Sequence, residues 1–211
     1  MELVERDYKV FREIERWRFC LSRHIQYLAG FSSQRICDRR LKFLLDENFL
    51  TRRIVLYGVP SAYLLTRKSK NLIFANKRPE RIRLDQITHD ITVLDIAICT
   101  IKSLSLLPAD IKTEKQLHQA DGFGEREHHP DFVFTKGDKT YCVEVELSLK
   151  SRARLNKNAK SNFINYDVQI WVVGDNSSRL SRQLEEFKRQ YPNIKITTIS
   201  EVKNGNFKFS D

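Results

Sequence analysis

The sequence predicts a mixed α+β or α/β fold built in two parts. Apolar residues recur at helical spacing through residues 5–47, which predicts a helical beginning. Residues 129–148 alternate as the strands of a β-hairpin do, and residues 168–173 form a short apolar run typical of a buried strand. A helical part followed by a part that mixes strands and helices is therefore expected.

Length and composition exclude several classes of protein. The chain has 211 residues and is 41% hydrophobic, which is enough for substantial cores. No apolar run approaches the length of a membrane span, and charge from Glu2 onward argues against a signal peptide. The four cysteines lie far apart, lack metal-ligand spacing and have apolar neighbours: Cys20, Cys37, Cys99 and Cys142. We therefore expect a cytoplasmic protein with reduced cysteines and no membrane partner.

Positive charge is concentrated at the N-terminal end. Residues 1–84 hold 19 Lys and Arg against 9 Asp and Glu, whereas the rest of the chain holds 18 of each. We expect a DNA-binding domain at 1–76, a basic linker at 77–84 and a neutral domain at 85–211. A solvated basic face without a ligand is the alternative.

Three helices are expected first. The first two are predicted at 5–18 and 21–29 from their apolar spacing. Ser32 or Ser33 is expected to cap a third helix that ends near Glu47. One face of this third helix is apolar, and the other holds Gln34, Arg35, Asp38, Arg39 and Lys42.

Two short strands follow at 49–57 and 62–65, around a turn at 58–61. Three helices followed by such a two-stranded wing resemble a winged helix-turn-helix domain, whose third helix enters the major groove of DNA. The expected base readers lie near the start of that helix: Ser33, Gln34, Arg35 and Arg39, with Lys42 on the same face. The expected phosphate contacts are basic residues of the wing and beyond: Arg52, Arg53, Arg67, Lys68 and Lys70. Winged helices also bind proteins, so the DNA assignment depends on the charge as well.

The second part is expected to begin with a long helix at 85–103. A short strand at 110–114 and a polar loop at 119–128 lead to the hairpin. The elements after the hairpin are a helix at 151–166, a strand at 168–173, a helix at 178–191 and a strand at 194–199.

The register of the hairpin follows from its turn. Gly-Asp at 137–138 is a two-residue turn with Gly first, as a type II′ turn prefers, and it pairs Lys136 with Lys139. Counting outward from that pair places Asp131 directly across from Glu144. Opposed residues share a face, with Cβ atoms about 4.5–5.5 Å apart.

A third carboxylate joins these two. Glu146 lies two residues beyond Glu144, so it returns to the face of Asp131, while Val143 and Val145 point to the other face. Carboxylates this close repel one another unless a cation lies among them, and oxygen ligands suit Mg²⁺ or Mn²⁺. The sequence therefore predicts a Mg²⁺ or Mn²⁺ site at Asp131, Glu144 and Glu146. Acids on the solvent face of an ordinary surface hairpin are the alternative.

Pro-Asp before one strand and Glu-x-Glu in the next, in this order of elements, resemble the restriction-endonuclease-like αβββαβ fold with its PD-(D/E)xK site. Over its whole length the chain resembles the replication-relaxation family of mobile elements, which includes conjugative relaxases lacking the His-hydrophobe-His site. The family-like stretches are Thr113-Glu114-Lys115-Gln116-Leu117, Pro130-Asp131-Phe132-Val133 and residues 143–151. The resemblance implies nicking of double-stranded DNA at a transfer or replication origin with a divalent metal. A coupling or accessory mobilisation protein is the further partner that it implies.

The resemblance also assigns roles to residues. Asp131 and Glu144 match the two metal-binding acids, and Glu146 stands where the pattern has lysine. Glu146 would then be a metal ligand or orient water, and Lys150 would supply the missing positive charge to the phosphoryl oxygens. Glu114 is the candidate for a further acid, ahead of His89 and Asp90.

Other polar residues near the hairpin have weaker assignments. His128 and His129 are interpreted as loop residues, because adjacent histidines on an extended chain point apart. Tyr141 and Tyr166 are possible covalent nucleophiles, but nothing beside either activates it, which favours hydrolytic nicking. A basic run without acids is expected to follow the DNA backbone or to be a solvated face: Lys150, Arg152, Arg154, Lys157 and Lys160.

Three functions remain open from the sequence. The first is a metal-dependent, site-specific DNA nickase of relaxase type. The second, which the glutamate at position 146 motivates, is an origin-binding or regulatory protein whose nuclease-like half is inactive. The third is a transposition-type endonuclease that needs a partner subunit. Oligomeric state and DNA target are not predicted.

Overall fold

The computed structural model describes residues 2–55, 57–78, 80, 82–121 and 128–207. The chain divides into two compact units, Met1–Leu94 and Asp95–Asp211. Helices and two separate sheets confirm a mixed α+β protein. No helix in the described ranges is both long and apolar enough to cross a membrane.

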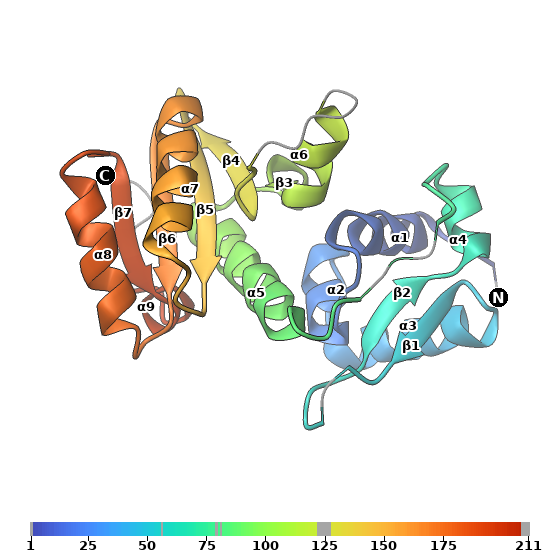
Figure 1. Cartoon of the computed structure of the whole chain (residues 1–211). Helices are drawn as coiled ribbons and strands as arrows, with labels where there is room; N and C mark the ends of the chain where they lie inside the picture. The colour runs from blue at the N-terminus through green and yellow to red at the C-terminus, as the bar shows by residue number, and fades with distance from the viewer. Residues whose placement is uncertain (1, 56, 79, 81, 122–127, 208–211) are drawn as a thin grey trace. The chain divides into compact units, whose positions relative to one another are not determined.

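The first unit begins with three helices, as expected: α1 (Glu5–Trp17), α2 (Ser22–Leu28) and α3 (Gln34–Asp46) (Figure 1). Ser33 is the N-cap of α3, and its side-chain oxygen accepts a hydrogen bond from the Ile36 backbone N–H. The apolar faces predicted from helical spacing are buried, with Phe11 of α1 and Leu41 of α3 fully enclosed. These helices form one compact core.

A two-stranded antiparallel sheet follows, made of β1 (Leu50–Arg53) and β2 (Ala62–Leu65). β1 is shorter than the predicted strand at 49–57. Gly58, in the turn between the strands, has a φ of +76°, a conformation that favours glycine. The unit therefore has the predicted succession of three helices and a hairpin.

A short helix that the sequence did not predict comes next. α4 (Arg67–Leu72) is capped by Thr66, whose hydroxyl accepts from the Ser69 backbone N–H. It turns Lys70 inward, where the ammonium donates to the Arg78 carbonyl oxygen (2.6 Å) and lies 3.6 Å from the Glu80 carboxylate. Lys70 is only 2% exposed, so its predicted phosphate contact is wrong.

The long helix α5 (Ile87–Leu104) runs across the division between the units. Ile87 and Ile91 at its beginning are buried in a cluster with Phe19, Leu21 and Val55 of the first unit. The segment expected as a linker, 77–84, therefore lies within the first unit, and the division falls inside the helix.

The second unit contains a five-stranded sheet in the order β3-β4-β5-β6-β7. Its first three strands are antiparallel: β3 (Lys112–Thr113), β4 (Phe132–Lys136) and β5 (Lys139–Glu146). β6 (Val168–Val173) and β7 (Ile194–Thr198) continue the sheet in parallel with β5. The strands predicted at 168–173 and 194–199 are thus confirmed.

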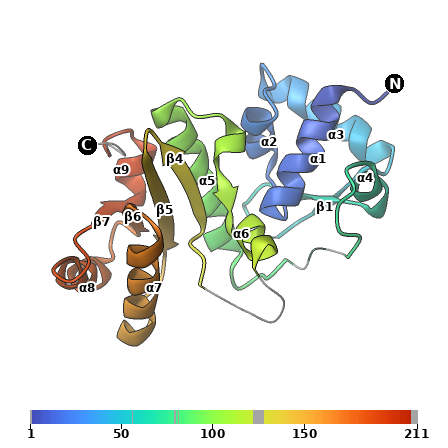
Figure 2. The same ribbon diagram turned by 90° about the horizontal axis from the view of Figure 1, so that it is seen from above.

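Helices cover both faces of this sheet (Figures 1 and 2). α7 (Arg152–Asn165) and α8 (Ser178–Lys188) lie on one face and bury Trp171 and Val173 of β6. The second half of α5 and α9 (Ile199–Lys203) lie on the other face, where the Lys203 ammonium is 3.3 Å from the Asp95 carboxylate.

One further helix replaces part of the predicted strand and loop. α6 (Glu114–Ala120) begins where the strand at 110–114 was expected to end. Thr113 caps it and Gln116 accepts from the Thr113 backbone N–H, which is a capping box. Residues 122–127 of the predicted loop lie outside the described residues.

Candidate functional site

The β-hairpin has the register that its turn predicts. Lys136 pairs with Lys139, and the ladder continues outward to Phe132 opposite Val143. Gly137 has a φ of +62°, as the first position of a type II′ turn requires. Because side chains alternate along β5, Glu144 and Glu146 leave the sheet on one face and Val145 on the other.

Asp131 lies just before β4 and reaches across to β5. Its Oδ2 accepts a hydrogen bond from the Val145 backbone N–H (2.7 Å), and its carbonyl oxygen accepts from the Glu114 backbone N–H (3.0 Å). The first bond fixes the carboxylate relative to β5, and the second joins the Asp131 backbone to the start of α6. The negative charge of Asp131 acts on Glu144 and contributes to raising the pKa of Glu144.

Glu144 is a buried acid beneath α7. Its Oε1 lies 2.6 Å from His128 Nε2 and accepts a hydrogen bond from Asn162 Nδ2 (3.0 Å). Only 5% of the residue is exposed, and this burial is the main cause of a raised pKa. The bonds from His128 and Asn162 act in the opposite direction without cancelling it. The predicted solvent-face alternative for this acid is therefore wrong.

Glu146 is also buried, and it is paired with Lys150. The Lys150 ammonium lies 2.5 Å from Glu146 Oε2, and the Ser148 backbone N–H donates to Glu146 Oε1 (3.4 Å). The side chain of Glu146 is 3% exposed and that of Lys150 is 25% exposed. The Lys150 ammonium thus lies beside Glu146, the residue that stands where the PD-(D/E)xK pattern has lysine.

Glu114 is the further acid that the sequence predicted for the hairpin site. It lies in the first turn of α6, where its Oε1 is 3.7 Å from His118 Nε2. Its backbone N–H donates to the Asp131 carbonyl oxygen (3.0 Å), and its role as a further acid of the hairpin site stays a prediction. His89 and Asp90 pair with each other on α5 (3.3 Å).

His128 is the residue of the site that sequence reasoning missed. His128 and His129 point apart, as predicted, since His128 contacts Glu144 and His129 contacts Asp121 (His129 Nε2 to Asp121 Oδ1, 2.6 Å). Both histidines lie in the loop before β4, as predicted, and each also has a carboxylate partner, which was not predicted. The sequence signal for this contact was the position of His128 and His129 directly before Pro130-Asp131.

The donor atoms around Glu144 suit a hard cation. Asp131, Glu144 and Glu146 offer carboxylate oxygens, which Mg²⁺ and Mn²⁺ prefer, but the described structure does not bring ligand atoms of all three within 4.8 Å of one another. Asn162 adds a buried amide oxygen, Oδ1, that has no hydrogen-bond partner among the described residues. An orphaned oxygen beside a buried carboxylate is chemically compatible with a cation or its bound water.

The residues expected to bind DNA are exposed, apart from the buried Lys70 and the half-buried Lys150. The residues are Ser33, Gln34, Arg35, Arg39, Lys42, Arg52, Arg53, Arg67, Lys68, Arg152 and Arg154. Several also have partners within the protein. Gln34 donates to Asp38 (2.7 Å), and Lys68 lies 3.9 Å from the centre of the Phe49 ring and donates to the Glu47 carbonyl (2.9 Å).

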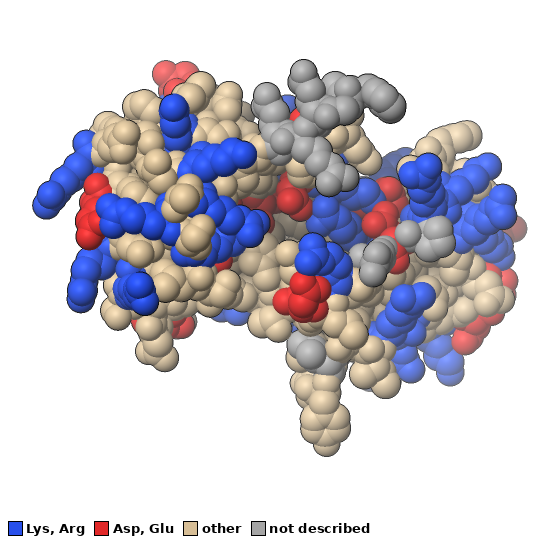
Figure 3. Space-filling view, viewed as in Figure 1, with Lys and Arg blue, Asp and Glu red and all other residues tan. Residues whose placement is uncertain are grey.

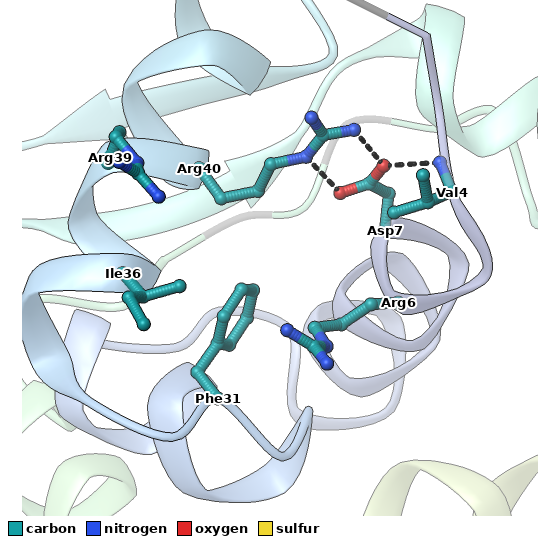
Figure 4. Close-up of a pocket in the computed structure, with 7 residues that line it drawn as sticks. All are labelled: Val4, Arg6, Asp7, Phe31, Ile36, Arg39 and Arg40. Atoms are coloured by element: carbon teal, nitrogen blue, oxygen red, sulfur yellow. Dashed lines mark hydrogen bonds and ion pairs between the residues drawn. The ribbon is translucent and has the colours of Figure 1, made fainter.

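Two pockets of the first unit include α3 residues. A groove between α3 and the β1–β2 hairpin brings Lys42 and Arg52 together with Pro60 and Ser61 of the turn. Arg39 instead lines a pocket of about 300 Å³ with Phe31 and the Asp7–Arg40 ion pair (Figure 4). Arg39 is therefore separated from the groove that contains Lys42.

In the second unit, Lys and Arg side chains gather over the face on which α7 lies (Figure 3). Arg152, Arg154, Lys157 and Lys160 of this helix are all exposed. Arg152 also contacts Glu186 of α8 (2.7 Å), so part of its charge is used within the fold.

Neither tyrosine is placed to act as a nucleophile. Tyr141 is 4% exposed and stacks on Phe134. Burial raises the pKa of Tyr166 to about 12, which disfavours its phenolate. The four cysteines are unbridged, as expected, with Cys20, Cys37 and Cys142 buried.

No family model matches the chain, and no curated protein or solved structure matches it either.

Proposed function

We propose that this chain is a divalent-metal-dependent DNA endonuclease that nicks DNA at a specific origin sequence. In this proposal the first unit is a winged helix-turn-helix and the second is a restriction-endonuclease-like domain. The relaxase-type activity follows from the resemblance to the replication-relaxation family and from the charge of the chain. The protein would work at a plasmid or mobile-element origin, with a coupling or accessory mobilisation protein as partner.

The first unit supports the DNA-binding half of the proposal. Its succession of three helices and a hairpin is that of a winged helix, and α3 exposes Gln34, Arg35 and Lys42. Arg52 of β1 lies in the same groove as Lys42. Asp38 and Asp46 also line this groove, so Lys42 and Arg52 are the groups there that suit a phosphate backbone.

One observation carries the catalytic half of the proposal. The negative charge of Asp131, just before β4, acts on Glu144 of β5, and the Lys150 ammonium forms an ion pair with Glu146. The PD-(D/E)xK pattern requires two acids and a lysine, and Lys150 supplies the ammonium from a position four residues beyond Glu146. A bound Mg²⁺ or Mn²⁺ would polarise a phosphoryl oxygen and lower the pKa of bound water.

The residues of the chain then have separate roles. Asp131 and Glu144 would hold the cation, and the Val145 N–H fixes the Asp131 carboxylate. Glu146 is a further ligand or orients water. Lys150 stabilises the negative charge that develops on the phosphate. His128 orients Glu144 through its Nε2.

A second function has an observation in its favour. Glu144 and Glu146 are both buried and each already has a protein partner, as in a nuclease fold that keeps its acids for structure. The chain would then be an origin-binding or regulatory protein without cleavage. The third function, a transposition-type endonuclease, differs only in needing a partner subunit.

Supercoiled plasmid that carries the chain's own origin separates these functions. The proposal predicts that purified protein converts it to open circles with Mn²⁺ or Mg²⁺, and that Asp131→Ala and Glu144→Ala do not. Equal nicking by the variants would refute the assigned site. Specific binding without nicking in any metal would establish the binding-only function, and nicking only with a co-encoded protein would establish the third.

A further inference from the structure

A second group of potential metal ligands lies outside the carboxylate site. His118 at the end of α6, Asp121 just after it and His129 before β4 bring one ligand atom each within 4.8 Å of one another. Two imidazoles and one carboxylate form a different donor set from the three carboxylates on the hairpin.

Asp121 is the centre of this group. Its Oδ2 lies 3.0 Å from His118 Nδ1, and its Oδ1 lies 2.6 Å from His129 Nε2. The two imidazole rings meet edge to face, with centroids 4.6 Å apart. The nitrogens that point at Asp121 are thus directed at one small volume from two segments of the chain.

A further carboxylate, that of Glu114, lies near the other nitrogen of His118. The remaining nitrogen of His118, Nε2, lies 3.7 Å from Glu114 Oε1. Histidines that bind a metal usually direct their other nitrogen at a carboxylate or carbonyl, which fixes the tautomer. With its proton on Nε2, His118 would present the Nδ1 lone pair towards Asp121.

We propose that His118, Asp121 and His129 bind a divalent transition metal of the Zn²⁺ class. Two imidazole nitrogens and one carboxylate oxygen are borderline ligands that suit Zn²⁺, Co²⁺ or Ni²⁺ rather than Mg²⁺. The side chains of Asp121 and His129 are each 14% exposed and that of His118 is 38% exposed. Three protein ligands with access to solvent leave a coordination position for water.

The location gives this metal a structural consequence. His129 is followed by Pro130 and Asp131, and preceded by His128, which contacts Glu144. A metal on His129 would therefore hold the segment that carries two residues of the hairpin site against α6. The proposal stands independently of the endonuclease function, because it concerns binding of metal only.

The test uses the full chain stripped of metal by a chelator. Zn²⁺ is titrated in competition with a chromogenic chelator, and Co²⁺ is titrated with detection of its visible absorption. We expect one tight equivalent in the wild type. His118→Ala and His129→Ala should each weaken it by more than about 100-fold, since loss of an outer-shell partner alone costs roughly 10–100-fold.

Two control variants make the result specific. His89→Ala removes a histidine that also has a carboxylate neighbour, Asp90, but no second imidazole in the described contacts. Glu144→Gln changes the hairpin site. Both should retain the tight equivalent.

A nearly isosteric variant, Asp121→Asn, covers the possibility that the alanine variants unfold. It should keep the circular dichroism of the wild type and lose the Zn²⁺-dependent rise in unfolding temperature that a ligand of the native state produces. The proposal is overturned if the wild type binds no Zn²⁺, or if Asp121→Asn binds it with wild-type affinity. It is also overturned if Glu144→Gln, rather than the histidine variants, abolishes binding.

Discussion

His128 Nε2 lies 2.6 Å from Glu144 Oε1, and this contact joins the segment before β4 to the buried acid of β5. Asp131 acts on the same acid from the same segment. A short stretch of chain thus supplies an imidazole and a carboxylate to one buried glutamate. This local concentration of ionisable groups is what the endonuclease proposal uses.

Glu144 should make stability depend on pH in a defined direction. Its raised pKa means that the folded state binds the proton more tightly than the unfolded state, whose pKa is the ordinary value of 4.5. Stability of the metal-free protein should therefore fall as pH rises from about 4.5 through the raised pKa. Glu144→Gln should remove this part of the dependence, measured as urea midpoints in chelator at several pH values. An unchanged pH profile would show that Glu144 does not titrate as assigned.

Removing a charge from the buried Asp7–Arg40 ion pair should destabilise the first unit more than removing a charge from an exposed pair. Asp7 is fully buried, accepts from Arg40 Nε (2.8 Å) and accepts from the Val4 backbone N–H (2.7 Å). Asp7→Ala removes the carboxylate of this buried ion pair and should lower the free energy of unfolding by about 3–5 kcal/mol. The control is Glu5→Ala, which breaks an exposed pair with Arg12 and should cost less than about 1 kcal/mol in the same denaturant titration. Equal effects would contradict the structural role of the Asp7–Arg40 pair.

Salt dependence of DNA binding should report the groove between α3 and the hairpin. Lys42→Ala and Arg52→Ala should each weaken origin binding and reduce the slope of log K against log salt by about 0.9, one released counterion per phosphate contact. Arg12→Ala removes an exposed cation of α1 and should leave the slope unchanged. Fluorescence anisotropy over a salt series measures both quantities. A slope that falls equally in all three variants would mean that binding follows net charge, not this groove.

Lys150 should act in catalysis and not in DNA binding. If its ammonium replaces the lysine of the pattern, Lys150→Ala should lower the nicking rate by about 10²–10³-fold, the usual cost of losing one charge-stabilising group. Adding Glu146→Lys to that variant should restore part of the rate, because the PD-(D/E)xK pattern has its lysine at this position. Quench-flow on plasmid measures the rates. A double variant as slow as Lys150→Ala would contradict the idea that Lys150 takes the role of the PD-(D/E)xK lysine.

The features that could be predicted from the sequence are those that local rules determine. The turn at 137–138 sets the pairing of Lys136 with Lys139, and this fixes every later pair of the hairpin. Ser33 as a helix cap was predictable for the same reason, because a cap interacts only with its own first turn.

Features that depend on distant parts of the chain were not predicted. The burial of Glu144 depends on α7, which brings Asn162 over the strand, and alternation along β5 cannot reveal a covering helix. Lys70 turns inward only because Arg78 and Glu80 offer it oxygen atoms. The helix α6 could have been predicted, because Thr113-x-x-Gln116 is a capping box, a local signal of a helix N-terminus.

The most direct test of the endonuclease proposal compares wild type with Glu144→Gln in a single experiment with two readouts. Origin binding is measured first without metal, and nicking of supercoiled plasmid is then started with Mn²⁺. We expect equal binding, nicking by the wild type, and no detectable nicking by Glu144→Gln, because the variant lacks the negative oxygen that would hold the cation. Mn²⁺-dependent nicking by Glu144→Gln at the wild-type rate would contradict it.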